Sequence, residues 1–396
     1  MEYIVKDNAE VMQFSTQSQK KTGQTPVHTH MVFVDILNIV CALAVVMLHT
    51  SLNVYAPERT QIWSFSLKLQ AVFIFAVPVF FMISGMNLLG YRTKYSTKEF
   101  FFKRVRRVGT AFLLGSILCY CLYCFFPHEF WGTESFVGVF GLKDFVKRML
   151  TNSINSTYWF FYTIIYLYVL TPVLSHIAHH KRTLQYVLAL TFFVGFLVPL
   201  AEFCGIRHEY FSNIFGWPFF ASWATFYYVG GYYLHRFVHF KKGLLSRPFI
   251  WVGIYVIATL AMYILTLYAN GWYAGAKLSH EYRNFIASPE SFVCVIQVLS
   301  VFLFVRSLEP WLAKLPALAK KILKTVSAAG VGIYLIQIPI INYISVKYDQ
   351  ALYAWLKDDA FIRGLFVFIV AAVMVVVLQG LWRALKRCAT SRVKSL

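Results

Sequence analysis

Residues 31–50, Met31-Val-Phe-Val-Asp35-Ile-Leu-Asn38-Ile-Val-Cys-Ala-Leu-Ala-Val-Val-Met-Leu-His49-Thr50, form an apolar run interrupted by only three strongly polar side chains. About 20 consecutive apolar residues are long enough to cross the hydrocarbon core of a bilayer as a helix. We therefore predict that this stretch is the first membrane-spanning helix. Its polar residues, Asp35, Asn38 and His49, are the first candidates for a functional site.

The three polar residues share one face of the predicted helix. A helix turns about 100° and rises about 1.5 Å per residue, so the eleven-residue step from Asn38 to His49 leaves them within roughly 20° and about 16 Å apart. Asp35 lies within about 40° of His49 by the same geometry. Lipid penalises polar groups, so this face should contact other protein or a water-filled cavity, and ionisable residues there are functional candidates.

The composition of the whole chain indicates an all-α polytopic membrane protein. Of its 396 residues, 59% are hydrophobic and only 14% are charged, whereas soluble domains are about a quarter charged. Apolar runs between charged or turn-rich breaks predict about ten transmembrane helices. They cover roughly residues 31–50, 68–90, 108–126, 158–178, 184–203, 214–235, 249–270, 291–308, 328–346 and 361–382.

The distribution of charge predicts the orientation of the chain. The net charge is +20, but most Lys and Arg residues fall in alternate loops, and no basic soluble domain remains to bind nucleic acid. The loops between them carry most of the acidic residues. The positive-inside rule therefore places both termini in the cytosol.

We expect three regions along the chain. Residues 1–30 are polar, lack the cleavage site of a secretory signal, and are predicted to form a flexible cytosolic tail. Residues 31–383 form the transmembrane domain. Residues 384–396 form a basic cytosolic C-terminal tail.

Three further stretches carry local structural signals. In the second span, Pro78 should bend the helix because it removes a backbone hydrogen bond, and Ser84-Gly85 permits close approach of a neighbouring helix. In the long loop 127–157, the portion from Asp144 to Leu150 is predicted to form a short amphipathic helix along the membrane interface. Aromatic residues at 158–162 are typical of a membrane belt, with a sugar-binding platform as the alternative.

Four stretches together resemble the acyltransferase-3 family of integral membrane acyltransferases that modify cell-surface and secreted carbohydrates. The sequence motifs are Val34-Asp-Ile-Leu-Asn38 followed by His49, the run 77–85, the basic run Lys103-Arg-Val-Arg-Arg107, and the segment 159–172. A weaker likeness is Gly332-Ile-Tyr-Leu-Ile336. Their order and spacing carry the resemblance, since each motif alone is loose.

The chain departs from the family pattern at two positions. The family usually has an arginine eleven residues before the histidine of the first span, where this chain has Asn38. The late Ile-Tyr-Leu-Ile segment is commonly followed by histidine, where this chain has Gln337. Both residues keep hydrogen-bonding capacity but lose a cationic or titratable group.

The resemblance implies an O-acyltransferase that moves an acyl group, expected to be acetyl, from cytosolic acyl-CoA to a sugar hydroxyl. The acceptor would be a cell-surface or exported polysaccharide or its lipid-linked precursor. A hydroxyl is a weak nucleophile and needs a positioned base, a role suited to histidine, which contributes about 10²–10⁴-fold. His49 is therefore the candidate general base, with Asp35 and Asn38 ordering the tunnel that leads to it; the alternative is a buried, hydrogen-bonded structural histidine.

Several other residues are candidate substrate contacts. Lys103, Arg104 and Arg107 are placed to hold the CoA phosphates, because guanidinium groups pair well with phosphate; the alternative is that they only fix topology. Ser84, Tyr158 and Trp159 complete the candidate set. We expect acyl-CoA as co-substrate, no tightly bound cofactor or metal, a carbohydrate acceptor, no nucleic acid, and residence in the bilayer of a bacterial cell membrane.

A protein of another class fits the same pattern. A transporter or flippase for a polysaccharide or lipid-linked sugar would also place polar residues inside the membrane. The neutral residues Asn38 and Gln337 favour this alternative, because a fold kept for passage would not need the family's charged groups.

Overall fold

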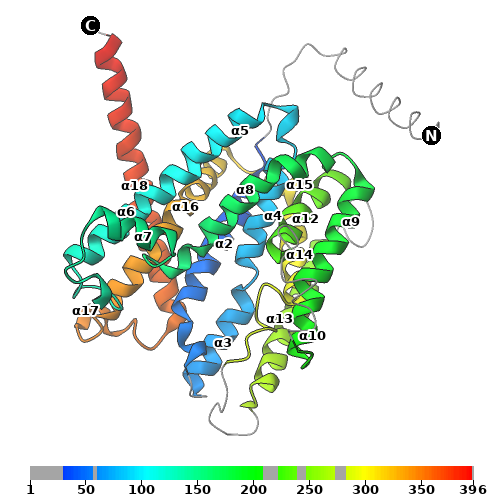
Figure 1. Ribbon diagram of the computed structural model, residues 1–396, viewed down its shortest axis with the longest axis horizontal. Coiled ribbons are helices and arrows are strands. Elements are labelled where there is room, and N and C mark those ends of the chain that lie inside the picture. The colour runs from blue at the N-terminus through cyan, green and yellow to red at the C-terminus, as the bar shows by residue number, and fades with distance from the viewer. Residues whose placement is uncertain (1–29, 57–59, 208–221, 239–246, 273–281, 395–396) are drawn as a thin grey trace. The chain divides into compact units, whose positions relative to one another are not determined.

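The computed structural model describes residues 30–56, 60–207, 222–238, 247–272 and 282–394. The predicted N-terminal tail, apart from His30, lies outside these residues. In the described residues the fold is helical without strands, and nine helices are long and apolar enough to cross a membrane (Figure 1). The predicted all-α polytopic class is therefore confirmed.

The helices follow one another along the chain with short connections. They are α2 (Val32–Thr50), α3 (Gln61–Phe73), α4 (Ala76–Leu88), α5 (Thr97–Arg104), α6 (Thr110–Phe125), α7 (Leu142–Leu150), α8 (Trp159–Ile177), α9 (Lys181–Phe192), α10 (Val198–Phe203), α12 (Trp223–Phe237), α13 (Pro248–Ala269), α14 (Phe292–Ser307), α15 (Glu309–Leu312), α16 (Ala317–Ser345), α17 (Ala351–Ala354) and α18 (Ala360–Lys394). Single 3₁₀ turns are Leu52–Tyr55, Tyr91–Thr93, Glu134–Phe136 and Ser156–Tyr158, and π-helical turns are Val105–Gly109 and Phe193–Leu197.

Nine of the ten predicted spans coincide with these membrane-length helices. The expected span 214–235 is described only from Ser222 onward, where it forms α12. Several helices extend past the predicted ends; for example, α16 begins at Ala317 and α18 continues to Lys394. The expected C-terminal tail is thus mostly a continuation of α18, and which side of the membrane it faces stays a prediction.

Helix α2 is the central element, as its apolar sequence predicted. It lies among other helices of the bundle (Figure 1) and contacts α3, α4, α14, α16 and α18. Most of its side chains are buried. Its polar face can therefore be assigned to particular neighbours.

The irregularity predicted at Pro78 is a short interruption between two helices, in which Ile74 and Phe75 keep right-handed helical φ and ψ. Helix α3 ends at Phe73 and α4 begins at Ala76. Pro78 has no N–H to donate to the carbonyl of Ile74, four residues earlier, so the helical hydrogen bonds fail at that point.

Helices α4 and α12 touch backbone to backbone at two glycines. A Cβ placed on Gly85 would lie 1.7 Å from the carbonyl oxygen of Tyr228, and one on Gly231 would lie 2.1 Å from that of Met82. The close approach predicted at Ser84-Gly85 is confirmed. Small residues allow this contact, which maximises packing between helices where lipid supplies no hydrophobic driving force.

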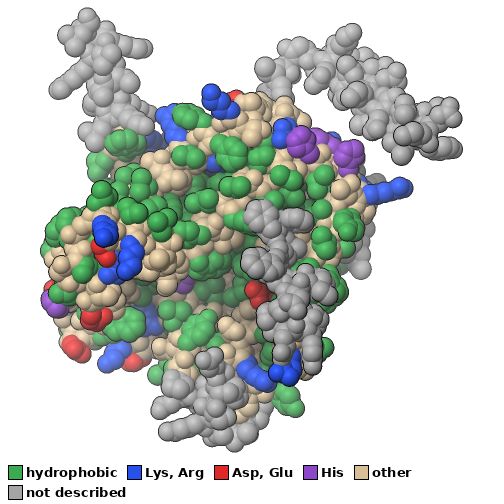
Figure 2. Space-filling view, in the orientation of Figure 1, with side chains coloured by type: hydrophobic (Ala, Val, Ile, Leu, Met, Phe, Trp, Pro, Cys, Tyr) green, Lys and Arg blue, Asp and Glu red, His purple; other side chains and the backbone are tan. Residues whose placement is uncertain are grey.

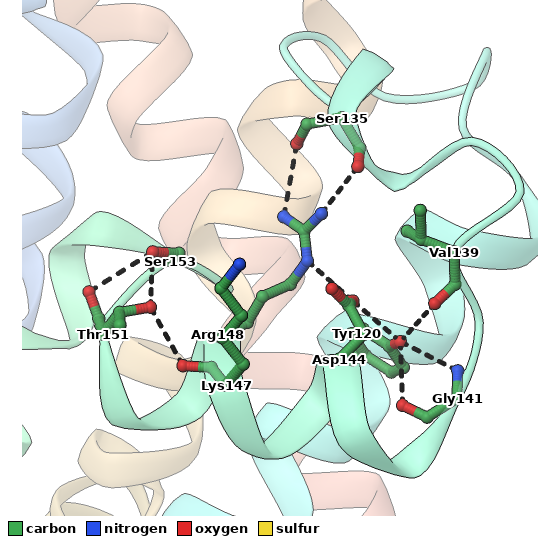
Figure 3. Close-up of polar contacts among 9 residues, drawn as sticks. All are labelled: Tyr120, Ser135, Val139, Gly141, Asp144, Lys147, Arg148, Thr151 and Ser153. Carbon is green, nitrogen blue, oxygen red and sulfur yellow. Dashed lines mark hydrogen bonds and ion pairs between the residues drawn. The ribbon is translucent and has the colours of Figure 1, made fainter.

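The long loop 127–157 is folded around α7 (Figure 3). The carboxylate of Asp144 accepts hydrogen bonds from Arg148 Nε at 2.8 Å and from the Tyr120 hydroxyl at 3.0 Å. Arg148 Nη2 also donates to the carbonyl of Ser135 at 2.6 Å. These bonds tie the polar face of α7 to its own loop and to α6.

The apolar face of α7 points the other way. Leu142 and Leu150 are 79% and 77% exposed, and Val146 between them is also exposed. The predicted helix is confirmed. Its position along the membrane interface stays a prediction, supported by this unpaired apolar stripe.

Acid should loosen the loop 127–157. Partial burial favours the neutral form of Asp144, but hydrogen bonds from Arg148 and Tyr120 outweigh it and hold the pKa of this carboxyl below its ordinary value. A depressed folded-state pKa stabilises the fold above the ordinary carboxyl pKa of about 3.9, and this stabilisation is lost as the pH falls through the folded value. Hydrogen exchange, corrected for intrinsic rates, should show weaker protection of α7 below about pH 4.

The matched variant is Asp144→Asn, which keeps the shape but cannot titrate. Its α7 amides should be less protected at neutral pH and show little further loss in acid. Equal acid sensitivity in the variant and the natural protein would assign the effect to other groups.

Candidate active site

The polar face of α2 lies against α16. Asn38 Nδ2 donates to the Ser327 hydroxyl at 3.2 Å, and His49, near the other end of α2, lies beside Tyr334 and Gln337. Contacts at both ends show that this face meets protein, as the helical spacing predicted.

The His49 side chain is half-buried and interacts with the Gln337 side chain. Its ring meets the Tyr334 ring edge-on, with centroids 6.3 Å apart. Its Nδ1 is buried without a hydrogen-bond partner, as is Oε1 of the neighbouring Gln337. An imidazole nitrogen that is not engaged by protein can accept a proton from another molecule.

Tyr334, which lies beside His49, is held by contacts with α8 and the turn before it. Its hydroxyl donates to the carbonyl of Thr157, and its ring packs against Phe160 and Phe161, with centroids 5.3 and 5.5 Å away. The start of α8 is therefore attached to the part of α16 that faces His49.

Tyr158 is part of this attachment. It is 1% exposed, its hydroxyl donates to the carbonyl of Leu335 at 2.9 Å, and it also meets Cys119 Sγ at 2.9 Å. Through these bonds Tyr158 joins α8 to α16 and α6. Its predicted direct contact with substrate stays a prediction.

A series of aromatic rings in contact leads from Tyr334 to Trp159. Successive ring centroids are 5.3 Å apart from Tyr334 to Phe160 and again from Phe160 to Phe81, then 5.6 Å from Phe81 to Trp223. Trp223 meets Trp159 edge-on at 6.1 Å. The sequence indicated Trp159 and Phe160 as part of the aromatic cluster 158–162, but it gave no sign that Phe81 and Trp223 would pack against them.

Two predicted contacts lie in other parts of the bundle. Asp35 is 5% exposed in the first turn of α2, where the helix dipole favours a negative charge. It precedes His49 by fourteen residues, a rise of roughly 21 Å along the helix. Ser84 is half-buried on α4, next to the Gly85 contact with α12. The predicted roles of both residues in contacting substrate stay predictions.

The basic run covers the end of α5 and the π-helical turn after it, and its side chains differ in their contacts and exposure. Lys103 is ion-paired with Glu99 at 2.7 Å and lies 4.1 Å from the Tyr95 ring centroid. Arg104 turns inward toward Tyr168, and its Nε is buried without a hydrogen-bond partner. Arg107 is exposed. The exposed Arg106 and Arg107 and the half-buried Arg104 are the members of the run outside the Lys103–Glu99 ion pair.

The basic run marks one end of the helix bundle. Figure 1 shows α5 at the same end as the beginning of α2, away from His49. On the face drawn in Figure 2, most acidic side chains lie toward the opposite end, whereas Lys and Arg side chains lie near both ends. The placement of the acidic side chains agrees with the charge pattern of the loops.

The described residues contain no group of three or more His, Cys, Asp or Glu side chains arranged to hold a metal ion. Three further histidines, His176, His179 and His180, lie exposed at the end of α8. This is the opposite end of the helix from Trp159 and the aromatic series.

These features define a multi-pass helical membrane protein with a weakly bonded histidine at an interhelical contact. An acyltransferase-domain family model matches residues 31–383. The chain belongs to the acyltransferase-3 family. No curated protein and no solved structure matches it.

Proposed function

We propose that the protein is a membrane O-acyltransferase that moves an acetyl group from acetyl-CoA to a hydroxyl of a cell-surface or exported polysaccharide or its lipid-linked precursor. Membership of the family supports membrane acyltransferase activity in general. The observation that carries the assignment to His49 is its buried Nδ1, which faces protein inside the bundle yet has no partner.

In the proposed reaction His49 acts as the general base. It takes the proton of the acceptor hydroxyl while the oxygen attacks the thioester carbonyl carbon. The C–S bond then breaks, and the CoA sulfur leaves with the proton returned by the imidazolium. Ester and free CoA are the products, and the histidine is regenerated.

Gln337 is placed to orient the ring. Its Nε2 donates to the carbonyl of Tyr334 at 3.3 Å, which leaves its unpartnered Oε1 beside the imidazole. An amide oxygen can accept the N–H of the second ring nitrogen and so select the tautomer that presents a free base.

The second candidate function is transport of a polysaccharide or lipid-linked sugar. The neutral pair Asn38 and Gln337, on α2 and α16, favours it. Ester analysis of surface polysaccharide with and without the gene separates the two. Loss of the acyl ester with polymer still exported supports the enzyme, whereas loss of export supports the transporter.

Neutralising Arg104, the last residue of α5, and Arg107, in the π-helical turn that follows it, should weaken acyl-CoA binding. The double variant Arg104→Gln/Arg107→Gln would remove two charge-assisted hydrogen bonds to phosphate, each worth about 1.5–3 kcal/mol. We therefore expect the KM for acyl-CoA to rise by about tenfold or more. Membrane insertion should not change. The measurement is initial rate against acyl-CoA concentration.

Lys98→Gln is the matched control, because Lys98 is an exposed lysine of α5 that is not among the candidate phosphate contacts. It should leave the KM close to that of the natural protein. An unchanged KM in the double variant would mean that the basic run only fixes topology.

A further inference from the structure

The last turn of α2, which carries His49, is held by side chains from two other helices. Gln70 of α3 donates from Nε2 to the carbonyl of Leu48 and to the Ser51 hydroxyl, both at 2.9 Å. Arg363 of α18 donates from Nη2 to the carbonyl of Thr50 at 2.6 Å. Carbonyls at a helix C-terminus have no intrahelical partner, so these side chains act as a cap supplied from outside the helix.

Arg363 is a buried cation with four neutral acceptors. It is 8% exposed. Besides the carbonyl of Thr50, it donates from Nη1 to the carbonyls of Leu356 and Lys357 at 3.0 and 2.9 Å and to the Tyr348 hydroxyl at 3.2 Å. The negative end of the α2 dipole compensates part of the cost of burying this charge.

The start of α18 is pressed against the same turn. Thr50 Oγ1 donates to the carbonyl of Ala360 at 2.9 Å. A Cβ on Gly364 would lie 2.4 Å from Met47 Sδ. Leu356 and Lys357 belong to the connection between α16 and α18, so Arg363 ties the end of α2 to the segment that follows the helix facing His49.

We propose that Arg363 and Gln70 are positioning residues that fix the imidazole of His49 against α16. The inference rests on the proposed role of His49 as base. His49 lies one residue before the carbonyl that Arg363 binds and one after the carbonyl that Gln70 binds. Loss of either cap would let the last turn unwind or rotate, and a displacement of about 1 Å can cost about 10²-fold in rate.

Arg363→Lys tests the proposal while keeping the charge. A lysine ammonium cannot reproduce the planar fork that reaches four acceptors, so the turn should lose its anchor. We expect kcat for acyl transfer from acetyl-CoA to fall 10- to 100-fold, roughly, with the KM for acetyl-CoA changed by less than about twofold. Rates are measured on monodisperse protein in nanodiscs and expressed per folded molecule.

Arg306→Lys is the matched control for a purely structural effect. Arg306 also caps a helix from outside, donating to the carbonyls of Leu234 and Val238 at 2.6 and 3.1 Å at the end of α12. It should change thermal stability without changing kcat per folded molecule. An equal loss of kcat in both variants would overturn the proposal.

Gln70→Leu gives a second, uncharged test if Arg363→Lys fails to fold. It should lower kcat in the natural background but add nothing to a His49→Ala protein, since no imidazole remains to position. Unchanged kcat in Gln70→Leu, or a further loss in the His49→Ala background, would refute the positioning role. A normal rate in His49→Ala alone would instead refute the proposed base.

Discussion

Replacing His49 with alanine should lower acyl transfer by about 10²–10⁴-fold, the usual contribution of a general base. The fold should survive, because Nδ1 of His49 makes no hydrogen bond to the protein and the side chain is only half-buried. The measurement compares ester formation by natural and variant protein at equal amounts of inserted, monodisperse material.

His49→Gln sharpens the test, since an amide keeps polarity and much of the volume but is not a base at neutral pH. It should be as inactive as His49→Ala. A His49→Ala protein that is folded, inserted and as active as the natural chain would refute the proposed mechanism.

The second large effect is expected at the contact of α4 and α12. Gly85→Val and Gly231→Val would each force a side chain into a backbone carbonyl that stands 1.7 or 2.1 Å from the first added carbon. Overpacking a core costs about 1–3 kcal/mol where side chains can shift. Here two backbones must separate, so we expect little or no monodisperse protein and a thermal midpoint too low to measure.

Alanine at Gly253 is the control for this prediction. It adds the same first carbon within a membrane helix, α13, at a position where nothing lies within 4 Å. Its size-exclusion profile should match that of the natural protein. Normal yield and stability of Gly85→Val would mean that α4 and α12 are not in backbone contact.

The central helix and its polar face were predictable because both depend on local regularities. The apolar run 31–50 sets the span, and helical spacing brings Asn38 and His49 to one side. Their neighbours on α16 were not predictable, since Ser327 lies 289 residues from Asn38 along the chain. The irregularity before Pro78 was predictable, because a proline removes one backbone hydrogen bond wherever it stands inside a helix.

The basic run shows a different limit of sequence reasoning. Lys103, Arg104 and Arg107 looked equivalent as a group, but adjacent residues on a helix point about 100° apart. The structure pairs Lys103 with Glu99 and turns Arg104 inward. The four-residue spacing of Glu99 and Lys103 was the available signal for that pair.

The cap on α2 had no distinct signal in the sequence. Arg363 stands at the beginning of an apolar span, where a cation ordinarily marks the membrane interface, and Gln70 is one polar residue in a long apolar segment. The carbonyls that they bind on α2 lie 313 and 22 residues away along the chain. Such contacts follow from tertiary packing, not from local pattern.

The most direct test uses sealed proteoliposomes with labelled acetyl-CoA enclosed and polysaccharide from a strain lacking the gene added outside. With the side of α5 facing the lumen, labelled ester should form on the external polymer, and His49→Ala vesicles should form none above background. Label transfer by His49→Ala vesicles at the rate of the natural protein would contradict the claim that an intramembrane imidazole links thioester on one side to alcohol on the other.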